Sequence, residues 1–283
     1  MSRLYDTLRR MEKDKQKPGS SAASDKPIEL LSTFIRVPPK PAEGPSAKVV
    51  VADESRLVAL SDPKGLGAEK FRALAARLEN IRQKTELKSL QITSAVINEG
   101  KSLVAANLAL TLAKQFGYTV LLVEGDLHRP TVGSLLGLGD QEGINHWWIK
   151  PSADKELIQY VVNLRDVSLS FLSSGSAFDQ PSQILQSSRF AESFAHLAAS
   201  FDWVVVDSTP LFPTVDANLW SRLVDGTLLV VREGVAPIKA LKMGVNSMDN
   251  PKWLGVVMNE VSDFNRLSYS YEPYEHKRPL SKK

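Results

Sequence analysis

The chain has no cysteine, which excludes disulfide bonds, thiolate zinc sites and cysteine nucleophiles. It also lacks an apolar run of the roughly 18 residues that a membrane-spanning helix needs, so we expect no transmembrane segment. Its start, MSRLYDTLRRMEKDKQK, has no apolar core of the kind that a signal peptide contains. These absences together favour a cytoplasmic protein.

An excess of one charge is missing as well. Lysine and arginine total 35 against 32 aspartate and glutamate residues, which leaves a net charge of +3. Domains that bind nucleic acid carry a clear basic excess, so we expect no nucleic-acid partner. The 43% hydrophobic and 24% charged residues are ordinary for a folded globular protein. A length of 283 residues allows one large domain with appendages, or two small domains.

Composition divides the chain into four segments. Residues 1–17 predict a short amphipathic helix, which either docks on a partner or stays solvated. Residues 18–50 contain six of the sixteen prolines and predict an extended linker. Residues 51–262 form the predicted nucleotide-binding domain, and residues 263–283 a flexible basic tail rich in tyrosine. The apolar positions of the first helix are Leu4, Leu8 and Met11.

Strands and helices alternate through the third segment, and the strands are continuously apolar. Strands of this kind are buried on both faces, which predicts a three-layer α/β fold with a mostly parallel sheet. Ligands in such folds bind at the carboxyl ends of the strands. Strands are predicted at 87–95, 118–124, 167–174, 203–208, 226–233 and 253–260. Helices are predicted at 67–84, 102–116, 189–201, 215–223 and 237–248.

The turn before the helix at 102–116 matches a relaxed phosphate-loop (P-loop) pattern, in which alanine and four further residues precede Gly-Lys-Ser. Gly100 lets backbone amides face a phosphate without a Cβ in the way, and the helix N-terminus adds partial positive charge. Lys101 should reach the β- and γ-phosphates, and Ser102 should bind Mg²⁺. An accidental Gly-Lys-Ser is the alternative. The predicted nucleotide-binding residues are Asn98, Glu99, Gly100, Lys101, Ser102 and Leu103.

Acidic residues close two other predicted strands. Glu124 and Asp126 follow the strand at 118–124, and Asp207 follows an apolar run within the strand at 203–208. A carboxylate at the end of a buried strand is costly unless it is paired or binds a metal, and Mg²⁺ prefers hard oxygen ligands. A helix cap or a loop carboxylate is the alternative at each position. We expect ATP and Mg²⁺ to bind where these ends meet the phosphate loop.

These motifs, SAVINEGKS, VLLVEGDLHRP and WVVVDSTP in this order, resemble those of the bacterial tyrosine kinases (BY-kinases) of polysaccharide export, which are relatives of the MinD/ParA ATPases. The resemblance covers roughly residues 53–275 and implies a P-loop NTPase fold with Walker A, A′ and B motifs. It implies that Ser102, Asp207 and Glu124 order Mg²⁺. It also implies that Asp126, with Glu124, positions or deprotonates the incoming phenol while Lys101 holds the phosphates.

The resemblance further implies transfer of the ATP γ-phosphoryl group to C-terminal tyrosines of a neighbouring subunit in a ring. Tyr269, Tyr271 and Tyr274 are the predicted phosphoacceptors; a final strand edge and a solubilising tail are the alternative. Family members that lack membrane spans usually pair with a membrane-anchored chain-length (co-polymerase) protein. We therefore expect a homo-oligomer that lies peripheral to the inner membrane through such a partner.

Several positions depart from the family pattern. Glu124 stands where the Walker A′ motif usually has aspartate, His128 where it has arginine, and Ile97-Asn98 where the loop usually has Pro-Gly. Ala75 replaces the last arginine of the Glu-x-x-Arg-x-x-Arg contact helix, and Val96 the signature lysine of MinD/ParA proteins. The favoured function is an ATP-dependent tyrosine autokinase that regulates exopolysaccharide or capsule production. A catalytically weak nucleotide-binding regulator of an export complex and a MinD-like membrane-associated ATPase are the alternatives.

Overall fold

A computed structural model describes the chain in six stretches, all of which lie in the second of two units, the one that begins at Pro39. The predicted N-terminal helix, most of the predicted linker and the tail with Tyr269, Tyr271 and Tyr274 lie outside the described residues. The described stretches are 45–48, 55–150, 156–165, 167–176, 180–249 and 251–261.

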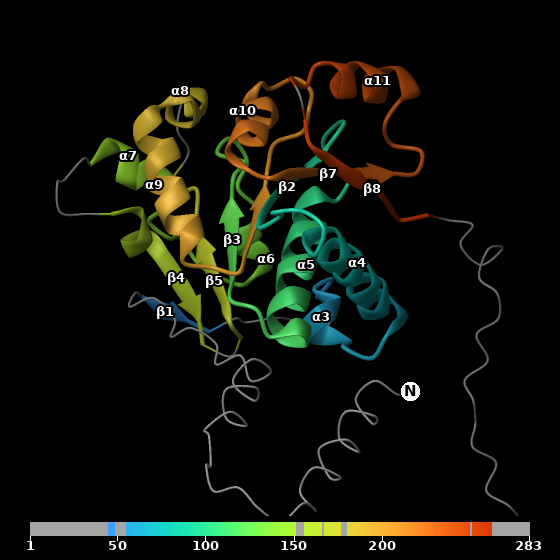
Figure 1. The fold of residues 1–283 in the computed structure, drawn as a ribbon, viewed down its shortest axis with the longest axis horizontal. Helices are drawn as coiled ribbons and strands as arrows, with labels where there is room; N and C mark the ends of the chain where they lie inside the picture. Colours follow the sequence, from blue (N-terminus) through green and yellow to red (C-terminus); the bar gives the residue numbers. More distant parts are fainter. Residues whose placement is uncertain are drawn as a thin grey trace, which may run out of the picture. The chain divides into compact units, whose positions relative to one another are not determined.

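Eight described strands form one sheet in the order β1-β4-β5-β3-β6-β2-β7-β8 (Figure 1). Neighbouring strands are parallel, except that β4 runs antiparallel to β5. The predicted mostly parallel sheet is therefore confirmed. The strands are β1 (Ser46–Ala47), β2 (Ser89–Ser94), β3 (Val120–Glu124), β4 (Val161–Leu164), β5 (Leu169–Leu172), β6 (Trp203–Asp207), β7 (Gly226–Arg232) and β8 (Trp253–Asn259).

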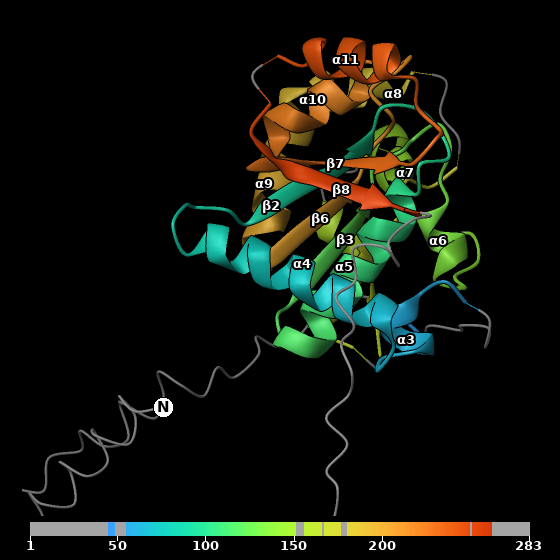
Figure 2. The same ribbon diagram turned by 90° about the vertical axis from the view of Figure 1, so that its right-hand side faces the viewer.

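Helices cover both faces of the sheet, which gives the predicted three layers (Figure 2). The first face carries α3 (Val58–Ser61), α4 (Leu66–Arg82), α5 (Lys101–Phe116) and α6 (Val132–Leu135). The second face carries α7 (Ile144–Ile149), α8 (Pro181–Gln186), α9 (Ser188–Ala199), α10 (Asp216–Leu223) and the 3₁₀ helix η1 (Leu157–Tyr160). Beside α10, α11 (Ile238–Asn246) packs against β7 and β8.

The central strands are buried on both faces. Leu122 packs into the core under α5, whereas its neighbours Leu121 and Val123 pack against the opposite core. This arrangement explains why these strands are continuously apolar rather than alternating. Helix α5 is buried from Val104 to Ala113 and ends at Phe116. The next residue, Gly117, adopts the left-handed conformation (φ +70°) typical of a helix C-terminus.

Sheet order brings the three predicted motifs together. Strand β6 lies between β2, which leads into the phosphate loop, and β3, which leads into the Glu124–Asp126 segment. Asp207 is the register partner of Ile92 on one side and of Glu124 on the other. The carboxyl ends of these strands therefore meet at one edge of the sheet. Within the described residues, no helix is long and apolar enough to cross a membrane.

Candidate nucleotide-binding site

The phosphate loop has two residues in the left-handed region, Asn98 (φ +64°) and Gly100 (φ +89°). Asparagine tolerates this conformation better than most residues with a Cβ, so the loop closes although Asn98 replaces a glycine. At Gly100 a Cβ would lie 2.2 Å from the side-chain nitrogen of Asn259. Helix α5 then begins at Lys101 without a side-chain cap. Its first amides are therefore free of a capping side chain and can donate to an anion.

Hydrogen bonds of Glu99 and Asn259 stabilise the phosphate loop. The fully buried Glu99 carboxylate accepts hydrogen bonds from the backbone nitrogens of Val96 (2.9 Å) and Arg232 (3.3 Å). The Asn259 amide donates to the Glu99 carbonyl (2.9 Å). The Glu99 side chain thus points into the protein rather than into the pocket. It links the loop to the end of β7, and the Glu99 carbonyl links the loop to the end of β8.

Lys101 lies between the two strand-end carboxylates. Its Nζ is 3.0 Å from Asp126 Oδ2, 3.5 Å from Asp207 Oδ1 and 3.3 Å from Ser102 Oγ. Burial lowers the pKa of Lys101, but the charges of Asp207 and Asp126 outweigh it, so the pKa is raised above its ordinary value. Lys101 is therefore cationic at neutral pH.

Asp207 has the chemistry of a magnesium ligand. It is fully buried, and burial raises the pKa of its carboxyl to about 6, although the charge of Lys101 and a hydrogen bond from Ser102 oppose the shift. Its Oδ2 has no hydrogen-bond partner among the described residues. An unpartnered buried carboxylate oxygen beside a serine hydroxyl suits a hard cation. Ser102 and Asp207 therefore fit Mg²⁺. Thr131, whose hydroxyl donates to Ser102 Oγ (3.0 Å), stands next to them.

Asp126 and His128 fix the turn that follows β3. The Oδ1 atom of Asp126 accepts a hydrogen bond from the backbone nitrogen of Arg129 (3.0 Å), while Oδ2 faces Lys101. His128 turns away and places its Nε2 2.9 Å from the buried Asp216 at the start of α10. Burial raises the pKa of Asp216 even though His128 opposes the shift. The residue that replaces the family arginine therefore anchors the turn instead of facing the pocket.

Glu124 is not among the residues that line the pocket, and its role in metal binding and catalysis stays a prediction. One carboxylate oxygen accepts from the backbone nitrogen of Gly133 (3.0 Å) in α6. The other lies near Ser173 Oγ (3.2 Å) and the nitrogen and hydroxyl of Ser174 (3.3 and 3.1 Å), which follow β5. The additional methylene of glutamate carries the carboxylate to these donors. Glu124 therefore ties three segments together, and its oxygens are occupied.

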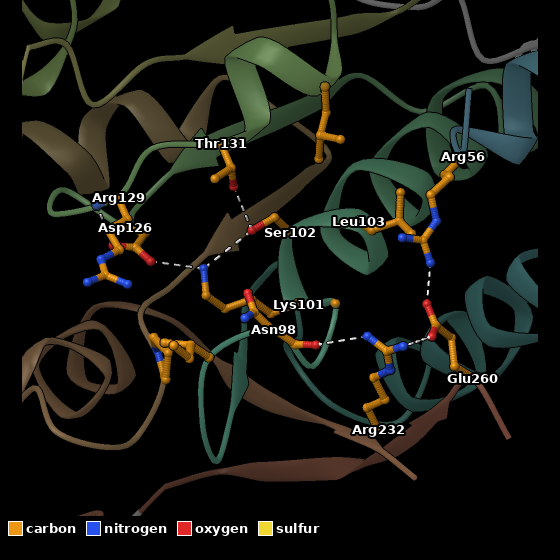
Figure 3. A pocket seen from close by; sticks show the side chains of 14 residues that line it. Arg56, Asn98, Lys101, Ser102, Leu103, Asp126, Arg129, Thr131, Arg232 and Glu260 are labelled. Carbon is orange, nitrogen blue, oxygen red and sulfur yellow. Dashed lines mark hydrogen bonds and ion pairs between the residues drawn. The ribbon is translucent and has the colours of Figure 1, made fainter. Parts of the chain in front are cut away.

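The site is a pocket of about 490 Å³ with two different ends (Figure 3). The acidic end comprises Lys101 with Asp126 and the buried Asp207 behind it. The arginine end comprises Arg56, Arg232 and Glu260. The pocket is lined by Arg56, Ile97, Asn98, Gly100, Lys101, Ser102, Leu103, Asp126, Arg129, Thr131, Leu135, Pro210, Arg232 and Glu260.

Sequence reasoning did not find the arginine end or Asn259. Asn259 is the last residue of β8, as Asp207 is the last residue of β6, and Glu260 directly follows β8. The rule that ligands bind at the carboxyl ends of parallel strands would have singled out both residues. Nothing in the local sequence marks Arg56, because its pocket neighbours lie far away along the chain.

Comparison with known proteins places these motifs in a family. The chain is 31% identical to CapB of Staphylococcus aureus over 212 residues, 74% of this chain and 91% of that protein. It is 30% identical to the tyrosine-protein kinase YwqD of Bacillus subtilis over 220 residues, 77% of this chain and 91% of that protein. A third relative, the succinoglycan biosynthesis transport protein ExoP of Rhizobium meliloti, is 32% identical over 233 residues, which are 79% of this chain but 29% of that protein.

Solved structures agree with these matches. The chimerical protein CapA2B2 superposes with a TM-score of 0.67 at 25% identity and covers 84% of this chain and 99% of that chain. MinD of Pyrococcus horikoshii, solved with Mg-ADP, has a TM-score of 0.51 at 19% identity over 62% of this chain and 72% of that chain. The MinD likeness supports the P-loop NTPase fold alone. No protein-family model matches the sequence. On the strength of the CapB and YwqD matches, the chain belongs to the family of bacterial tyrosine-protein kinases.

Proposed function

We propose that the protein is an ATP-dependent tyrosine kinase that phosphorylates its own C-terminal tyrosines and regulates exopolysaccharide or capsule production. The observation that carries this proposal is the position of Lys101 at the phosphate loop, 3.0 Å from Asp126 and 3.5 Å from Asp207. A cation held by two carboxylates beside free helix amides is prepared to exchange one anionic partner for a phosphate.

The residues of the pocket divide the binding task. The first amides of α5 and the Lys101 ammonium would hold the β- and γ-phosphates of ATP. Ser102 and Asp207 would hold Mg²⁺, and the unpaired oxygen of Asp207 supports this assignment. Magnesium, when bound, would neutralise negative charge on the phosphate oxygens. Thr131 would orient the Ser102 hydroxyl through the hydrogen bond between them.

Asp126 is the candidate general base. A tyrosine phenol has a pKa of about 10 and needs a base or a cation to react at neutral pH. The backbone nitrogen of Arg129 fixes one Asp126 oxygen, and a phosphate that takes Lys101 would free the other. That oxygen would accept the phenol proton while the phenolic oxygen bonds to the γ-phosphorus, and the bond from phosphorus to the β–γ bridging oxygen breaks to release ADP.

One observation favours a second candidate, a catalytically weak nucleotide-binding regulator of an export complex. The carboxylate of Glu124, the first acid of the Walker A′ motif, is taken up by Gly133, Ser173 and Ser174. Of the two acids of the Walker A′ motif, the pocket is therefore lined by Asp126 but not by Glu124. Nucleotide binding does not depend on that acid, whereas the phosphoryl transfer rate does if it acts as the family pattern implies.

Partners are proposed from the relatives. The names of the CapA2B2 chimera and of the transport protein ExoP support an association with a membrane-anchored chain-length protein, which would hold this chain at the inner membrane. A homo-oligomer, in ring form, would bring the tail of one subunit to the pocket of the next. In the contact helix α4, Glu69 and Arg72 pair with each other at the surface and Ala75 is buried, so a ring contact would use the first two positions.

The test is incubation of purified full-length protein with ATP and Mg²⁺, followed by anti-phosphotyrosine detection and mass spectrometry of the tail. We expect phosphate on Tyr269, Tyr271 or Tyr274, and none in the Lys101→Met variant. Phosphate on the variant would contradict the proposed role of Lys101. ATP binding without phosphotyrosine, even with the membrane partner present, would support the regulator instead.

A further inference from the structure

A single carboxylate bridges two guanidinium groups at the arginine end of the pocket (Figure 3). One oxygen of Glu260 pairs with Arg56 Nη2, and the other pairs with Arg232 Nη2. The three residues come from the segment before α3, the end of β7 and the position after β8. Because one negative charge faces two positive charges, the bridge leaves a net positive charge at the pocket wall.

This bridge is fixed to the phosphate loop. Arg232 Nη1 donates to the Asn98 carbonyl (3.4 Å), and the backbone nitrogen of Arg232 donates to Glu99. Glu260 has a left-handed backbone (φ +49°), which is uncommon for a residue with a Cβ. Its neighbour Asn259 is held by the Glu99 carbonyl. The hydrogen bond of Asn259 and the two ion pairs therefore hold the Glu260 carboxylate between the arginines.

The position of the bridge suits the course that the proposed function gives to a nucleotide. Lys101 would bind the terminal phosphates, with the acidic end beyond it on one side. The remaining phosphate and the ribose would then extend to the other side of the phosphate loop, where Arg56 and Arg232 line the pocket. A guanidinium pair binds phosphate and carboxylate oxygens with the same geometry. A carboxylate between two arginines thus occupies a place that is chemically suited to a phosphate.

We propose that Arg56 and Arg232 form a second anion subsite of the nucleotide pocket, and that Glu260 fills it until a nucleotide phosphate displaces the carboxylate. This inference rests on the proposed function, because its ligand is the phosphate of ATP or ADP nearest the ribose. The side chains of Arg56, Arg232 and Glu260 are 66%, 39% and 32% exposed. Exposed ion pairs are weak, so a nucleotide that carries several charges can replace them.

The test measures ATP and ADP affinity of the full-length protein by isothermal titration calorimetry. Glu260→Gln removes the competing charge and should tighten ATP binding by about 3- to 10-fold. Glu142→Gln is the matched control, because it removes the same charge from an exposed pair, Glu142 with Lys150 (3.6 Å), outside the pocket. It should leave the affinity unchanged.

A second variant changes the affinity in the opposite direction. Arg56→Gln should weaken ATP binding by about 3-fold, and combining it with Glu260→Gln should remove most of the gain. Arg56 is well exposed, so this variant should fold normally. Tighter or unchanged binding by Arg56→Gln, or an unchanged or weaker affinity of Glu260→Gln, would overturn the subsite. If the wild-type protein bound no ATP at all, both the subsite and the proposed function would be wrong.

Discussion

The two ends of the pocket differ in burial and in origin. At the acidic end, the side chains of Lys101, Asp126 and Asp207 are 11%, 6% and 0% exposed. Asp207 ends the central strand β6, and Asp126 lies in the turn after the central strand β3. At the arginine end, Arg56, Arg232 and Glu260 are at least 32% exposed and come from one edge of the sheet and the segment before α3. Electrostatic interactions are far stronger in a buried site than at a surface. The acidic end is thus suited to chemistry and the arginine end to exchangeable binding.

This contrast leads to different expectations for substitutions at the two ends. Changes at the acidic end should alter the rate of phosphoryl transfer or the stability of the fold, because the side chains there are buried and paired. Changes at the arginine end should alter nucleotide affinity by small factors and leave the rate unchanged.

The largest effect is expected for Asp126→Asn. The amide cannot accept the phenol proton, so kcat should fall by about 10²- to 10⁴-fold, while the KM for ATP changes little. Steady-state phosphorylation of a tyrosine peptide, with ATP and peptide varied separately, measures both constants. A raised KM for ATP with an unchanged kcat would show that the acidic end, like the arginine end, affects nucleotide binding rather than the rate.

Gly100→Ala probes the loop that joins the ends. The new Cβ would collide with Asn259 and force a left-handed backbone on alanine. We expect a loss of about 2 kcal/mol in the free energy of unfolding and at least about tenfold weaker ATP binding.

Gly117→Ala is the matched control at the other end of α5. Its φ is also positive (+70°), but its Cβ would meet nothing within 4 Å. It should lower stability by about 1 kcal/mol and leave ATP affinity intact. Equal affinity losses in the two variants would show that Asn259 does not brace the loop.

Asp207→Asn measures how much the buried carboxylate lowers the free energy of unfolding of the nucleotide-free protein. Its pKa of about 6 exceeds the ordinary 3.8, so the folded state holds this proton more tightly than the unfolded state does. The free energy of unfolding should therefore fall as the pH rises from about 4 to 6, by an amount on the order of 1–3 kcal/mol.

The asparagine variant should lack this fall and be more stable by about 1 kcal/mol above pH 7. Urea unfolding from pH 4 to 8 provides the measurement, with the exposed Asp140→Asn as the control. A variant that is less stable than the wild type at every pH would show that Asp207 supports the fold rather than straining it.

The smallest effect is expected for Glu124→Gln. The amide keeps the size of the side chain but cannot accept all the hydrogen bonds from Gly133, Ser173 and Ser174. We expect a loss of about 1 kcal/mol in stability and less than about fivefold in kcat, with the same Mg²⁺ dependence. A loss of activity as large as that of Asp126→Asn would place Glu124 among the acids that act on substrate.

Local sequence was sufficient to predict the acidic end. Asp207 ends β6, Asp126 lies two residues beyond β3, and Gly100 and Lys101 follow β2 through the phosphate loop. The order of a parallel sheet brings such ends together. The same reasoning predicted most long helices and strands to within a few residues. It missed α3, α6, α7, α8, β1 and β4, because elements of two to six residues are too short to show a hydrophobic period.

The features that sequence reasoning missed depend on contacts between distant residues. The position of the Glu124 carboxylate is set by serines 49 and 50 residues away. The bridge from Arg56 to Glu260 spans 204 residues. Neither contact leaves a periodic or compositional trace, so a single sequence predicts the acidic residues of a motif more easily than the direction in which each side chain points.

The hydrogen bond from Asn259 to the Glu99 carbonyl has a practical consequence for shortened versions of the chain. A truncation that ends at Met258 would remove the amide that supports the phosphate loop together with every C-terminal tyrosine. Its inactivity would then say nothing about phosphoacceptors. A stop codon placed after Val261 separates the two effects, since it deletes the tyrosines and retains the support.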